Sequence, residues 1–127
     1  MSQRPGSLAE VAQGSTTQRD FHVHLADFLD ELRRRRDPAM FAIEPASLRD
    51  RFDGGDVADA YLGAVAVSIA RELRVPPPPW VHGPKRHLRR PWFAHPGEAL
   101  RATLLAESPA AFRERNLFVS ANALDRA

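Results

Sequence analysis

Histidine spacing is the first place to look for chemistry in this chain. His22 and His24 form a His-x-His pair, which suits a metal site on a strand, where residues i and i+2 share a face. The surrounding apolar residues instead recur with a helical period, and about 100° of turn per residue places the two rings about 200° apart. His82, His87 and His95 are unevenly spaced, with no carboxylate nearby. The histidines therefore predict no metal site.

Acidic residues gather around a Gly-Gly turn, at Asp50, Asp53, Asp56 and Asp59. This group lacks the alternating ligands and the terminal glutamate of a calcium-binding EF-hand loop. We interpret it as helix caps and solvated charge. The chain contains no Gly-x-Ser-x-Gly, His-Glu-x-x-His, Ser-x-x-Lys or phosphate-loop motif. We therefore expect a protein that is not an enzyme and carries no cofactor.

The segment from Val75 to Pro96 has the most unusual composition. Pro76 to Pro79 lead into Trp80, and Pro91 is followed by Trp92 and Phe93. Proline removes a backbone donor and fixes φ, which disfavours both a regular helix and a central strand. Large aromatic side chains on a stiff backbone lose little entropy on docking, so this segment is suited to a contact surface.

Three interpretations of this segment remain open. In the first, it binds another protein, and the contact residues are Trp80, Arg89, Arg90, Trp92 and Phe93. In the second, it binds nucleic acid through phosphate contacts, with the tryptophans stacking on bases; the contact residues are Lys85, Arg86, Arg89 and Arg90, extended by the run Arg33–Arg36. In the third, the tryptophans are core residues that hold the segment against the helices.

Composition indicates one globular domain. Of the 127 residues, 43% are hydrophobic and 27% are charged, which is ordinary for a folded protein. The formal net charge of +2 implies no nucleic-acid partner by itself. The absence of cysteine excludes disulfides and thiolate chemistry. The longest apolar run, 60–67, is too short to cross a bilayer, and the N-terminus lacks an apolar signal region, so we expect a cytoplasmic protein without a membrane partner.

Hydrophobic periodicity predicts the elements that position these residues. We expect a flexible N-terminal leader at 1–15 and a single helical domain at 16–127. The expected helices lie at 17–36, 45–52, 56–74, 96–106 and 108–115. The small and apolar residues of 56–74 predict the central helix. The fold class is all-α, a small irregular bundle of about five helices with a proline-rich wrapping segment.

The C-terminal sequence LLAESPAAFRERNLFVSANALDRA, residues 104–127, carries a family resemblance, together with Pro79-Trp80 and Pro91-Trp92-Phe93. It resembles the ending of small bacterial antitoxin-like proteins encoded beside nucleotidyltransferase-type toxins. The resemblance covers about residues 75–127 and implies that the chain binds and neutralises or regulates another protein, in a toxin–antitoxin system. Residues 1–55 show no helix-turn-helix, so DNA binding of the antitoxin kind is not implied.

Overall fold

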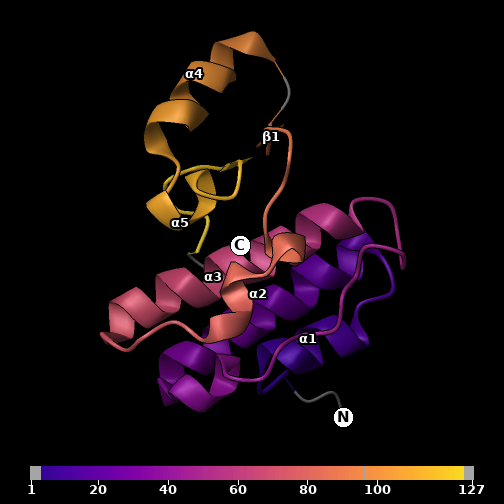
Figure 1. The fold of residues 1–127 in the computed structure, drawn as a ribbon, viewed down its shortest axis with the longest axis vertical. Helices are drawn as coiled ribbons and strands as arrows, with labels where there is room; N and C mark the ends of the chain where they lie inside the picture. The colour runs from indigo at the N-terminus through magenta and orange to yellow at the C-terminus, as the bar shows by residue number, and fades with distance from the viewer. Residues whose placement is uncertain (1–3, 96, 125–127) are drawn as a thin grey trace.

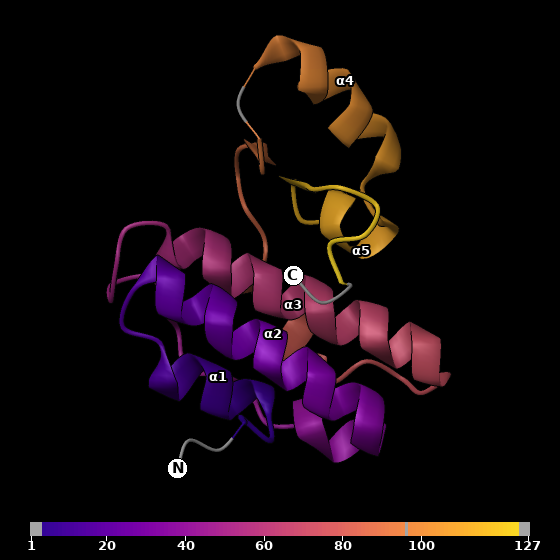
Figure 2. The same cartoon turned by 180° about the vertical axis from the view of Figure 1, so that it is seen from behind.

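The computed structural model describes residues 4–95 and 97–124 and is mainly helical, which confirms the all-α prediction. Figures 1 and 2 show a layer formed by α1, α2 and α3, with α4 and α5 standing on one side of it. The chain crosses from the layer to α4 through the proline-rich segment. The proline-rich segment thus connects the two parts of the molecule.

The N-terminal helix α1 (Leu8–Gly14) occupies a region where we expected a flexible leader. The Ser7 side chain caps it by accepting a hydrogen bond from the N–H of Glu10. Leu8, Val11 and Ala12 are fully buried, because spacings of three and four residues place them on one face of a short helix. The described part of the leader is therefore folded into the core.

The helix α2 (Gln18–Arg35) agrees closely with its prediction. Thr17 caps it by accepting from the N–H of Asp20 at 3.0 Å, and Arg36 ends it in a left-handed conformation just before Pro38. Its buried face consists of large apolar side chains at helical spacing: Phe21, Leu25, Phe28, Leu29 and Leu32. This stripe packs against α1 and α3.

The central helix α3 (Gly55–Leu73) is the most buried element, again as predicted. Its alanines and Gly63 let α2, α5 and the proline-rich segment approach it closely. The helix predicted at 45–52 does not form. The side chain of Asp59 on α3 accepts hydrogen bonds from the Leu48 N–H and the Ser47 hydroxyl, which holds this stretch in turns instead.

Besides three short 3-10 helices (Pro38–Phe41, Pro79–His82 and Pro84–Arg86), the remaining elements are β1 (Trp92–Phe93), α4 (Glu98–Glu107), α5 (Ala110–Arg113) and β2 (Leu117–Phe118). The helices predicted at 96–106 and 108–115 correspond to α4 and to a shorter α5, and Pro96 lies outside the described residues. The two strands pair in parallel, with Trp92 opposite Leu117 and Phe93 opposite Phe118. The sequence did not predict this pairing. Among the described residues, no helix combines the length and apolarity needed to cross a membrane.

Tyr61, the only tyrosine of the chain, lies in an aromatic contact between the layer of α1, α2 and α3 and the part that contains α4 and α5. Its ring meets Phe21 and Phe112 edge-on, with centroids 6.3 and 5.0 Å apart. Burial disfavours the phenolate and raises the pKa of Tyr61 to about 12.

An alkaline titration checks this burial. Tyrosine in an unfolded chain titrates near pH 10, so the folded protein keeps Tyr61 neutral to a higher pH. The contribution of neutral Tyr61 to the free energy of unfolding is fully present below pH 10. As the pH rises from 10 towards 12, the free energy of unfolding falls by about 2 to 3 kcal/mol. Ultraviolet absorbance of the phenolate measures the midpoint. A midpoint near 10 in the folded protein would contradict the packing, and Tyr61→Phe serves as the baseline.

Candidate functional site

The proline-rich segment is anchored by Trp80, which is only 9% exposed. Its indole N–H donates to the carbonyl of Phe41 at 3.0 Å, and the guanidinium of Arg86 lies 5.0 Å from its ring centroid. A tryptophan held in this way is a core residue that fixes the loop. The structure therefore does not present Trp80 as a contact residue for a partner, although the sequence placed it in that set.

Arg86 is also buried, with a relative exposure of 1%. Its Nη2 donates to the Pro45 carbonyl at 2.6 Å, and its Nη1 lies 3.6 Å from Oδ1 of Asp59. Asp59 is itself fully buried, so the interpretation of this carboxylate as solvated charge is wrong. Arg86 likewise leaves the set of residues that we assigned to nucleic-acid binding, because its charge is paired inside the protein.

A second buried arginine, Arg115, crosses α3 beside Arg86. Its Nη2 donates to the Val81 carbonyl at 2.9 Å, and its Nη1 donates to the Ala111 carbonyl at 3.2 Å. Burial lowers the pKa of Arg115. Both arginines need Gly63, where an added Cβ would lie 3.0 Å from Cβ of Arg86 and 3.1 Å from Nε of Arg115.

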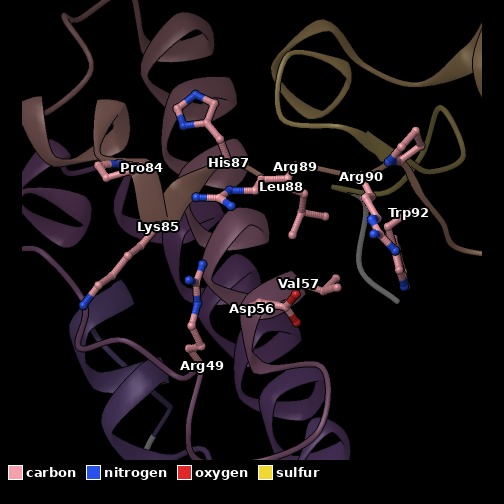
Figure 3. Close-up of a pocket in the computed structure, with 11 residues that line it drawn as sticks. Arg49, Asp56, Val57, Pro84, Lys85, His87, Leu88, Arg89, Arg90 and Trp92 are labelled. Atoms are coloured by element: carbon pink, nitrogen blue, oxygen red, sulfur yellow. The ribbon is translucent and has the colours of Figure 1, made fainter.

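Burial of Arg86 directs its neighbours in the basic run outwards. Lys85, Arg89 and Arg90 are exposed, and together with Arg49 they surround an open groove of about 840 Å³. Figure 3 shows Arg49 and the single carboxylate, Asp56, on one side of this space, with the residues of 84–92 along the other. We call this space the basic groove; its lining residues are Arg49, Asp56, Val57, Pro84, Lys85, His87, Leu88, Arg89, Arg90, Pro91 and Trp92.

Among the described residues, the four cations of the basic groove are not paired with acidic side chains, and Asp56 is the one carboxylate in the lining. Within residues 4–95 and 97–124, Arg49, Lys85, Arg89 and Arg90 form no salt bridge with an acidic side chain. A concave surface lined by charges of one sign concentrates their field and attracts ligands of the opposite sign. The excess of positive charge in the groove therefore favours an anionic ligand.

The same groove has an apolar component. Val57 of α3, Leu88 and the prolines at 84 and 91 line it, and half-buried Trp92 closes the end at β1. Apolar side chains between cations suit a ligand that combines acidic and apolar groups.

The structure thus brings together Lys85, Arg89, Arg90 and Trp92 from the predicted sets. Phe93 lies apart from the groove lining: its ring stacks on Phe118 at 5.0 Å. The run Arg33–Arg36 also lies apart. It forms the end of α2, where the Arg33 side chain donates to the Leu124 carbonyl and Arg34 pairs with Glu31.

Sequence reasoning missed Arg49 and Asp56 as groove residues. Arg49 lies in the stretch that we predicted to be helical, and Asp56 was assigned to a helix cap. Arg49 follows the stretch 47–48 that Asp59 holds by hydrogen bonds, and Asp56 lies on α3, against which 84–86 packs; no local pattern signals either position. The part of the chain that the structure describes contains no group of three or more histidine or acidic side chains placed to hold a metal.

Comparison with known proteins adds no identification: no protein-family model matches the chain, and no curated protein or solved structure matches it significantly. The basic groove is therefore interpreted from its own geometry.

Proposed function

We propose that this chain is a non-catalytic protein-interaction module that binds an acidic segment of another protein in the basic groove. The observation that carries the proposal is the set of unneutralised cations, Lys85, Arg89 and Arg90, on an open groove with an apolar lining. Complementary charge steers a partner to such a surface and selects against basic partners. Trp92 supplies an aromatic contact of the kind that dominates many interfaces.

A nucleic acid is the second candidate, because the same cations attract phosphates. Two features favour a protein. Sequence-tolerant binding of single strands uses several aromatic side chains on which successive bases stack, and burial of Trp80 leaves Trp92 as the only tryptophan lining the groove. Arg86, one of the four predicted phosphate contacts, is paired inside the protein.

The resemblance of the C-terminal sequence supplies a finer form of the proposal. It implies an antitoxin-like or accessory role, with a nucleotidyltransferase-like toxin as the partner. In this form the module neutralises its partner sterically, by occupying an acidic surface of the toxin.

Charge reversal tests the basic groove. A labelled octapeptide of alternating glutamate and valine is the probe, and fluorescence anisotropy measures its affinity. We expect the double variant Arg89→Glu, Arg90→Glu to bind this peptide at least about tenfold more weakly, because two attractive charges become repulsive. Both side chains are exposed, so the fold should be preserved.

The matched control is Arg19→Glu, Arg113→Glu. It changes the net charge equally at exposed positions that do not line the groove. Equal weakening by both double variants would show a general charge effect and would contradict the proposal. An oligothymidylate that binds more tightly than the peptide, with affinity falling steeply between about 50 and 200 mM salt, would instead establish the nucleic-acid candidate.

A further inference from the structure

The strand β1 has one edge that pairs with β2 and one that does not. The N–H of Trp92 donates to the Asn116 carbonyl at 2.8 Å, and the N–H of Ala94 donates to the Phe118 carbonyl at 2.9 Å. Backbone groups alternate between the two edges of a strand, so the N–H and C=O of Phe93 point away from β2. Among the described residues, neither group has a hydrogen-bond partner outside this sheet.

Both faces of this two-stranded sheet are occupied. Leu117 is fully buried and Trp92 is half-buried beside Val57 of α3. On the other face, Phe93 stacks on its neighbour in β2, and the guanidinium of Arg101 on α4 lies 4.7 Å from the Phe93 ring centroid. Figure 1 shows β1 at the end of the segment that leads up from the helical layer. The free backbone edge is therefore the part of β1 that a partner can still engage.

An isolated sheet of two short strands gains stability when a third strand is added. Two strands by themselves are marginal in water, and an unpaired edge is a template for another chain. Pro91 has no N–H, so the available edge is short and centres on the one N–H and one C=O of Phe93. Most of the affinity must then come from neighbouring side chains rather than from a long ladder.

The basic groove supplies those side chains. Arg89 and Arg90 precede β1 with only Pro91 between, and Arg101 lies over the Phe93 ring, so cations lie at the start of β1 and on one of its faces. Phe93 follows the lining residue Trp92 in sequence, so its backbone groups lie one residue beyond the groove lining. Acidic side chains would match the cations, and a peptide backbone would match the N–H and C=O at strand spacing, which a nucleic acid does not.

We infer that the acidic segment of the partner binds in an extended conformation and adds to the free edge of β1 as a third strand. This inference rests on the proposed function and deepens it, since it states the conformation in which the partner segment binds. The main-chain hydrogen bonds of Phe93 fix the segment, and the cations of the groove select its acidic side chains.

Amide hydrogen exchange by NMR tests the inference on the labelled full chain with the glutamate–valine octapeptide. We expect the Phe93 amide to move downfield and its exchange to slow by at least about tenfold in the complex. The Trp92 and Ala94 amides, which already donate to β2, should change little. Two further octapeptides carry N-methyl groups, one on every valine and the other on every glutamate. With at least one of these peptides, the exchange of the Phe93 amide should not slow.

The outcomes separate this inference from the proposed function. Shifts at Arg89 and Arg90 with no protection of Phe93 would overturn strand addition and leave groove binding standing. No response at either place would overturn both. Equal protection of Phe93 by oligothymidylate would also overturn strand addition, because this ligand has no peptide backbone. Protection by both methylated peptides would do the same, because an added strand must use the N–H groups of either its valines or its glutamates.

Discussion

Asp59→Ala should lower the free energy of unfolding by about 3 to 5 kcal/mol. The substitution leaves the guanidinium of Arg86 buried with the exposed Glu44, at 3.3 Å, as its remaining carboxylate partner, and it removes the acceptor of the Ser47 hydroxyl and the Leu48 N–H. Urea unfolding, analysed with the slope as well as the midpoint, measures the loss. Asp53→Ala is the control, because this exposed carboxylate lies in the same acidic group, and we expect a change within about 0.5 kcal/mol.

A double-mutant cycle separates the ion pair from the packing around it. Asp59→Ala combined with Arg86→Met removes both charges and keeps an apolar chain beside Trp80. This pair of changes should cost less than the sum of the two single changes, since no uncompensated charge stays in the core. Additive losses, or a loss below about 1 kcal/mol for Asp59→Ala, would show that the pair does not hold the proline-rich segment in place.

Gly55→Ala should be the second most damaging change. A Cβ at this position would lie 1.8 Å from the Leu48 carbonyl oxygen and 3.0 Å from Cα of Arg49, so the backbone of 48–49 must move. We expect a loss of at least about 2 kcal/mol in the free energy of unfolding, as for other overpacked sites. Because Arg49 moves with this backbone, peptide affinity at the basic groove should fall as well.

The control for this change is Gly14→Ala. There the added Cβ would meet only the side chain of His24, at 3.4 Å, and alanine is the better helix former. We expect a change within about 1 kcal/mol. If Gly55→Ala were as stable as the unchanged protein in the same urea titration, the close approach of 48–49 to α3 would be wrong.

Local patterns were sufficient for the long helices. The stripe that includes Phe21 and Leu25 predicts α2, and the alanine-rich run with Gly63 predicts the central position of α3, because both depend on side chains within a few turns. The two-residue strands could not be predicted, because Trp92-Phe93 and Leu117-Phe118 are too short to show an alternation of apolar and polar residues.

Residues of the same type in the proline-rich segment have different environments, and their spacing in the sequence does not predict which of them are buried. Trp80 and Trp92 each follow a proline, yet within the described residues only Trp80 donates to a distant carbonyl, that of Phe41. Arg86 and Arg89 belong to one basic run, but Asp59 draws only the former into the core. Contacts between residues far apart in sequence decide which of these side chains remain for a partner.

The parallel pairing of β1 and β2 has a consequence for how this chain tolerates change. The two strands clamp the ends of the stretch that contains α4, and within α4 only Leu104 is buried. When the ends of a loop are held independently of its content, doubling its length costs only about 0.6 kcal/mol in closure entropy. Insertions or exchanges at α4 should thus leave the helical layer intact, so this helix can vary more freely than the buried helix α3.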